Sequence, residues 1–172
     1  MDIRRWAFAI GPVAAAAGLG GLGARNAAQV YGRLGKPRWA PPAAAFGPVW
    51  SALYVSIAAA GWRLARGTSP TTRTLHLTQL ALNAAWPAAF FAARNRRASL
   101  AVIGALDVAL TAEVLRLRRE DPVTAALLLP YLIWTGYATA LNAGVEEPSA
   151  PTGSHPPLRL RDRAVRRRRR AG

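Results

Sequence analysis

Cysteine is absent from this sequence of 172 residues, and histidine occurs only twice. Without cysteine the chain can form no disulfide, thiolate zinc site, iron–sulfur cluster or cysteine nucleophile. Two histidines also disfavour a metal site built from imidazoles, so we expect no metal site. Acidic residues are few as well: eight, against 23 basic ones, leave a formal net charge of +15. No acid–base pair or nucleophile triad is recognisable, which gives ordinary hydrolytic or redox chemistry no support.

What the sequence does contain is apolar residues, which make up 52% of it, beside 18% charged residues. They gather in five stretches almost free of charge. These stretches cover residues 6–24, 43–62, 74–93, 98–115 and 122–143. Each holds about 20 residues, the length that a helix rising ~1.5 Å per residue needs to cross a hydrocarbon layer of ~30 Å. Because arginines cluster in the gaps, the pattern predicts an all-α integral membrane bundle of five transmembrane helices.

The first apolar stretch has a second interpretation. Arg4 and Arg5 precede it and small residues end it, as in a secretory signal peptide, and the arginine pair is also a feature of twin-arginine signals. The next part of the chain, however, is another hydrophobic stretch and not a soluble domain. This order favours a retained helix.

The composition changes near residue 146, where prolines, polar residues and eight arginines begin, including Arg166 to Arg170 in succession. Such a segment cannot form a core and is expected to be disordered. We therefore divide the chain into a membrane domain, residues 1–145, and an Arg-rich tail, residues 146–172. The tail fits an anchor to anionic lipid or a determinant that keeps the C-terminus cytoplasmic. Nucleic-acid contact is the less favoured partner.

The connection between the first two stretches is rich in proline. Pro37, Pro41 and Pro42 prevent a helix from passing through it, and Pro48 is expected to bend the next helix. Trp50 and Tyr54, four residues apart, share one face of that helix. A proline-braced loop above aromatic side chains would close the mouth of an apolar pocket. For Trp39 an aromatic belt at the membrane surface is an equally good interpretation.

Polar and aromatic residues also recur inside two later stretches. Gln79, Asn83 and Trp86 share one helical face, as do Trp134 and Asn142 with their neighbours. An amide inside an apolar span must face another helix or a ligand, because an unbonded amide is costly there. Both alternatives stay open for the two asparagines.

Two acids fall within the fourth stretch. Asp107 is either a functional carboxylate or, as the favoured interpretation, a neutral or hydrogen-bonded residue of the bundle. Glu113 is expected to pair with Arg116 near the water, since the two are three residues apart on one helix.

Three motifs in this order resemble the tryptophan-rich sensory protein and translocator protein family (TspO/MBR, peripheral-type benzodiazepine receptor). They are Lys36-Pro37-Arg38-Trp39-Ala40-Pro41-Pro42 with Phe46-Gly47-Pro48-Val49-Trp50 and Leu53-Tyr54, then Leu82-Asn83 with Trp86-Pro87 and Phe90-Phe91, then Pro130-Tyr131 with Trp134 and Ala138-Thr139-Ala140-Leu141-Asn142. The resemblance covers about residues 6–145 and implies a multi-pass bundle, commonly a homodimer, with a pocket beneath the first loop. We expect it in a bacterial cell membrane.

The resemblance also implies ligands. Members bind tetrapyrroles such as protoporphyrin IX and haem, with no obligatory cofactor, and animal members bind cholesterol and benzodiazepine-type compounds. Carried over by motif position, the ligand-binding residues are Trp39, Trp50, Tyr54, Asn83, Trp86, Trp134, Ala138 and Leu141. Transport of such ligands and light-dependent porphyrin breakdown are the alternatives to plain binding. For the latter, Trp50 and Trp134 are the catalytic candidates.

This chain departs from the family pattern in two places. Ala44 stands where the family often has a second tryptophan after the double proline, so the loop has one aromatic fewer. The segment from Asn142 to Glu147 lacks the aromatic and basic residues of a cholesterol-recognition pattern. We therefore expect no specific sterol recognition.

Overall fold

The structure is a computed structural model that describes residues 3–146. It is built from helices: α1 (Ile3–Gly23), α2 (Ala27–Arg33), the 3₁₀ turn η1 (Ala43–Ala45), α3 (Phe46–Leu64), α4 (Pro70–Pro87), the π-helical segment η2 (Ala88–Ala92), α5 (Arg96–Glu120) and α6 (Pro122–Gly144). No strand occurs among these residues, and one isolated bridge joins Gly35 to Glu146. The all-α prediction is therefore confirmed. Residues 147–172 of the expected tail lie outside the described residues.

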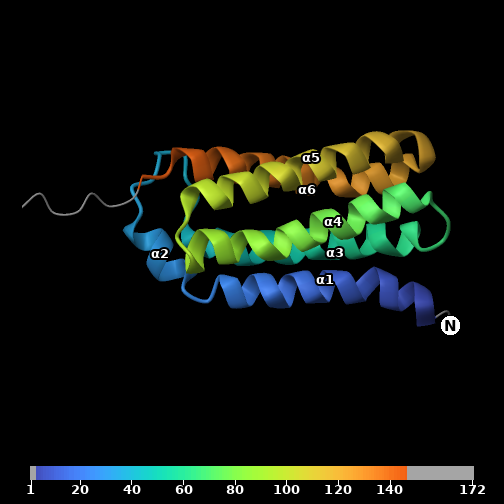
Figure 1. Cartoon of the computed structure of the whole chain (residues 1–172), viewed down its shortest axis with the longest axis horizontal. Helices are drawn as coiled ribbons and strands as arrows, with labels where there is room; N and C mark the ends of the chain where they lie inside the picture. The colour runs from blue at the N-terminus through green and yellow to red at the C-terminus, as the bar shows by residue number, and fades with distance from the viewer. Residues whose placement is uncertain (1–2, 147–172) are drawn as a thin grey trace, which may run out of the picture.

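The five long helices lie side by side in one elongated bundle (Figure 1). α1 contacts α3 and α4, α4 contacts α5, α5 contacts α6, and α6 contacts α3, so the helices form a closed ring. The interior of the ring is filled by residues such as Ile57, Leu64, Leu110 and Leu128, none of which is exposed. α2 and η2 lie together at one end of the bundle (Figure 1).

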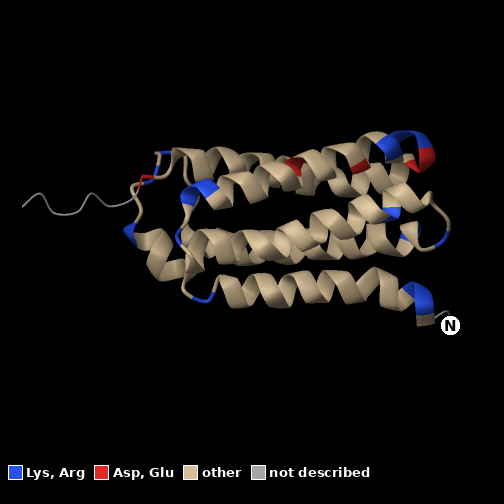
Figure 2. Ribbon diagram, viewed as in Figure 1, with Lys and Arg blue, Asp and Glu red and all other residues tan. Residues whose placement is uncertain are grey.

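The outer surface of the bundle is apolar halfway along its length. Val55, Val108 and Ile133 are each more than 70% exposed, whereas His76 and Gln79 are completely buried. A water-soluble protein would show the reverse arrangement. Basic residues gather at the two ends of the bundle and are rare between them (Figure 2). This distribution is typical of a protein that crosses a membrane.

Within the described residues, four helices are long and apolar enough to cross a bilayer: α1, α3 with its 3₁₀ turn, α5 and α6. The prediction of five spans is thus supported for four of them. α4 differs because its buried face carries Thr72, His76, Gln79 and Asn83, which lower its mean hydropathy.

Several helix ends differ from the sequence prediction, each for a local reason. The stretch 74–93 divides into α4 and η2 after Pro87, which has no N–H group to continue the hydrogen-bond ladder. α5 begins two residues earlier than predicted because Asn95 caps it, accepting a hydrogen bond from the Ala98 N–H at 3.0 Å. Pro48 lies in the first turn of α3, where its missing N–H removes no helical bond.

Candidate functional site

A cavity of about 380 Å³ lies at the α2 end of the bundle. Four helices contribute to its wall. They are α1 with its last two turns, the short helix α2, α3 with its beginning, and α4 with its end and the adjoining η2. The lining residues are Ala17, Gly20, Gly21, Ala24, Ala27, Ala28, Tyr31, Ala43, Phe46, Gly47, Trp50, Tyr54, Asn83, Trp86, Pro87 and Phe91. The volume is within the ~300–1,000 Å³ that is usual for small-molecule sites.

Aromatic rings form one side of this cavity and small residues form the other. Trp50 packs against Tyr54 with ring centroids 5.4 Å apart, and Trp86 lies 6.0 Å from Phe91. Opposite them, α1 presents alanine and glycine, whose small side chains leave the space open. The wall of this cavity is therefore largely apolar and carries two indole rings.

The proline-rich loop is held above the cavity by Tyr31. The Tyr31 hydroxyl donates a hydrogen bond of 2.7 Å to the Pro41 carbonyl, and the ring packs edge-on against Phe46 at 5.2 Å. Lys36 Nζ donates to the Tyr31 carbonyl at 2.7 Å. Burial raises the pKa of the Tyr31 hydroxyl, so it remains a neutral donor at neutral pH. These contacts tie α2 to the loop.

Asn83 is the main polar group of the cavity wall. It accepts a hydrogen bond from the Tyr54 hydroxyl and donates one to the Tyr131 hydroxyl, both at 3.0 Å. These bonds join α3, α4 and α6. The indole Nε1 of Trp86 is buried and has no hydrogen-bond partner among the described residues.

The eight predicted ligand-binding residues fall into two groups. Trp50, Tyr54, Asn83 and Trp86 line the cavity, whereas Trp39, Trp134, Ala138 and Leu141 do not. Trp39 is 50% exposed and contacts Tyr137 at 5.4 Å.

The other three residues outside the lining pack behind it. Trp134 packs against Phe46 at 5.9 Å. Ala138 shares a hydrophobic cluster with Trp86, and Leu141 shares one with Tyr31. Each therefore supports a residue of the wall from behind.

Sequence reasoning did not identify Tyr31, Phe46 and Phe91 as wall residues, nor the small residues of α1. The signal available in the sequence was the spacing of Ala17, Gly20 and Ala24, which places three small side chains on one helical face. No pattern in the sequence indicated α2, which has only seven residues.

The polar residues of the bundle also have defined partners. Thr139 donates to Asp107 Oδ2 at 2.6 Å, which confirms Asp107 as a hydrogen-bonded residue of the bundle. Asn142 and Ser99 bond each other between α6 and α5. The asparagine amides thus join helices, and Asn83 also reaches the cavity.

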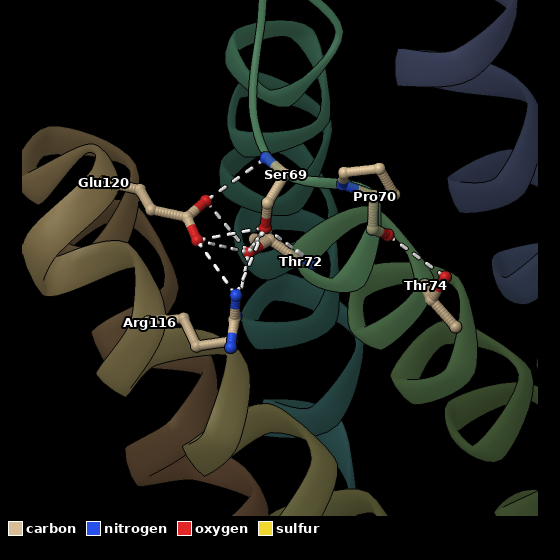
Figure 3. Close-up of polar contacts among 6 residues, drawn as sticks. All are labelled: Ser69, Pro70, Thr72, Thr74, Arg116 and Glu120. Carbon is tan, nitrogen blue, oxygen red and sulfur yellow. Dashed lines mark hydrogen bonds and ion pairs between the residues drawn. The ribbon is translucent and has the colours of Figure 1, made fainter.

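The expected pairing of Glu113 with Arg116 is wrong. Arg116 instead reaches the N-terminus of α4, at the end of the bundle away from the cavity, where it donates to Glu120, Ser69 and Thr72 (Figure 3). Glu113 points into the bundle and contacts His76 at 2.8 Å. The reason is that α5 presents Glu113 to the interior and Arg116 to the surface.

Comparison with known proteins agrees with the motifs. The family model described as TspO/MBR matches residues 8–147. The human translocator protein is 35% identical over 118 residues, which are 65% of this chain and 70% of that protein. A tryptophan-rich protein TspO from Archaeoglobus fulgidus is 34% identical over 67% of this chain and 76% of its own length. The tryptophan-rich sensory protein of Cereibacter sphaeroides is 33% identical over 65% and 72%. This chain is thus a multi-pass membrane protein that belongs to the TspO/MBR family.

Proposed function

We propose that the cavity binds a tetrapyrrole such as protoporphyrin IX or haem, or a similarly flat hydrophobic molecule, for sensing, sequestration or transport. The observation that carries the proposal is the aromatic wall formed by Trp50, Trp86 and Phe91 facing the small residues of α1. A planar ring system gains both area burial and ring contacts on such a wall.

We further infer that α4 crosses the membrane with the other four long helices. Its polar residues face the interior of the ring, where Asn83 bonds α3 and α6, so they need not meet lipid. A polar face satisfied inside a bundle is compatible with a spanning helix. If all five long helices cross the membrane, α6 ends at the α2 end of the bundle, and the Arg-rich tail follows α6 in the sequence. The positive charge of the tail favours placing this end of the bundle in the cytoplasm.

The binding proposal is tested by titrating purified protein with protoporphyrin IX while following tryptophan fluorescence. We expect saturable quenching, and an affinity reduced about two- to tenfold by Trp50→Leu, since one aromatic contact contributes about 0.5–1.5 kcal/mol. Trp62→Leu is the matched control, because Trp62 packs against Trp6 on α1 and is not part of the cavity wall. Quenching that does not saturate, or equal effects of both substitutions, would contradict the proposal.

A further inference from the structure

A histidine and a glutamate meet in the interior of the bundle, outside the cavity. His76 on α4 and Glu113 on α5 are both completely buried, and His76 Nδ1 lies 2.8 Å from Glu113 Oε1. Gln79, also completely buried, lies 3.4 Å from the same imidazole nitrogen and bonds Glu113 as well. The contact joins two neighbouring helices of the ring.

The cluster has polar atoms that are not satisfied. His76 Nε2, Glu113 Oε2 and Gln79 Oε1 have no hydrogen-bond partner among the described residues. An ionised carboxylate is costly in such a place unless both oxygens are bonded. A proton on Glu113 would convert an unsatisfied acceptor into a donor, and Gln79 Oε1 is an acceptor without a partner in the same cluster. The arrangement thus accommodates more than one protonation state.

The groups that face the pair come from several helices of the bundle. On the neighbouring helices the groups that face it are the Phe8 ring and the Ala9 backbone from α1, Gly61 from α3 and the Tyr131 hydroxyl from α6. The charged residues within about a turn of these are Arg5, Arg63, Arg73 and Arg116. Arg63 and Arg116 are bonded to groups at the end of the bundle, whereas the Nε atom of Arg73 is buried without a hydrogen-bond partner among the described residues. Asp107 on α5 interacts electrostatically with the Tyr131 hydroxyl.

We propose that His76 and Glu113 form an intramembrane proton-binding site. The two side chains hold one proton along the contact of 2.8 Å, and the unpartnered Oε2 atom of Glu113 is the acceptor that can take a second one. The second proton comes from solvent water and adds to the Glu113 carboxylate to give a carboxylic acid, leaving His76 as imidazolium. No other reactant is required.

The pair lies about one helical turn from the polar end of the bundle. Thr72, four residues before His76 on the same face of α4, is bonded to Glu120 at the polar end of the bundle. This separation is about 6 Å along the helix. In the other direction Asn83 lies seven residues away, about 10 Å. A change of charge at the pair would therefore occur between the solvent end and the cavity.

Nuclear magnetic resonance on the full-length protein in vesicles tests the proposal. The chain has two histidines, so ¹⁵N-histidine labelling of a His155→Gln variant reports on His76 alone. With ¹³C-labelled glutamate, we expect the His76 ring and the Glu113 carboxyl to change together over one pH range between about pH 4 and 9, as coupled groups do. Constant signals from both residues throughout that range would overturn the proposal.

Two substitutions on α5 complete the design. Glu113→Gln should remove the carboxyl signal and move the midpoint of the His76 transition by about one pH unit or more. Glu120→Gln, at the end of the same helix, should leave both signals as they are. An unchanged His76 transition in Glu113→Gln would refute a shared site. Because the unsubstituted pair already gives a decisive result, failure of the Glu113 variant to fold would not weaken the test.

Discussion

The crossing of α1 over η2 allows one substitution to be worked out in detail. Gly23, the last residue of α1, lies so close to η2 that a Cβ atom built on it would be 2.7 Å from the Ala88 nitrogen and 3.1 Å from the Pro87 carbonyl carbon. Both contacts are with backbone, which cannot rotate away as a side chain would. In Gly23→Ala the end of α1 must therefore move off η2.

Overpacking of this kind costs about 1–3 kcal/mol. For a protein of this size, 1 kcal/mol corresponds to about 2–4 °C in Tm. We expect Gly23→Ala to lower the Tm of the purified protein by about 2–12 °C, measured by circular dichroism in detergent. The matched control is Gly18→Ala on the same helix, where no described atom other than the neighbouring backbone of α1 lies within 4 Å of the added methyl group.

The control should change stability in the opposite direction. Replacing a glycine inside a helix with alanine contributes about 0.5–1 kcal/mol when the methyl group has room. Gly18→Ala should thus raise the Tm by about 1–4 °C. If Gly23→Ala matched or exceeded the Tm of the unsubstituted protein, the backbone contact between α1 and η2 would not exist as described.

Two further predictions concern the polar ends of the bundle. Hydrogen bonds from Arg63 hold the pKa of Asp121 at about 2, below its usual 3.8, so this stabilisation is complete above about pH 4 and is lost as the pH falls toward 2. Asp121→Asn keeps a residue able to cap α6 and should flatten the fall of Tm below about pH 4; an unaltered slope would exclude this role. The second prediction concerns which end of α4 faces which side of the membrane. Because the chain lacks cysteine, single cysteines can be introduced as Gly32→Cys, Thr71→Cys and Ala93→Cys, and each variant can be labelled with an impermeant maleimide in sealed vesicles. Five crossings require Thr71 to react from the side opposite to Gly32 and Ala93, whereas Thr71 and Ala93 on the same side would mean that α4 does not cross.

Much of the bundle could be predicted because long apolar stretches and their charged borders are local properties. The positions of α1, α3, α5 and α6 follow from them to within a few residues. The sequence also predicted that Gln79, Asn83 and Trp86 share one face of a helix, and all three are buried on α4. Helical periodicity alone decides which residues share a face.

The errors arose where a residue had a choice between local and distant partners. Spacing favoured Arg116 for Glu113, yet the packing of α4 on α5 supplies His76, 37 residues away in sequence. The motif also predicted Trp134 in the cavity wall. In the structure Phe46 lines the cavity and Trp134 packs against it, and ligand contact by Trp134 stays a prediction. Such outcomes depend on how far each helix is rotated and shifted against its neighbours.

The sequence by itself determined that this chain forms apolar helices long enough for a membrane, because hydrocarbon thickness and helical rise set a length that can be counted in residues. It did not determine which small residues matter. Four of the six residues from Gly18 to Gly23 are glycines, yet Gly20 and Gly21 line the cavity, Gly23 lies against the η2 backbone, and a Cβ at Gly18 would meet no described atom outside its own helix. Only the tertiary structure separates these roles, because the distance between two helices is set by all the side chains along their contact and not by any one position.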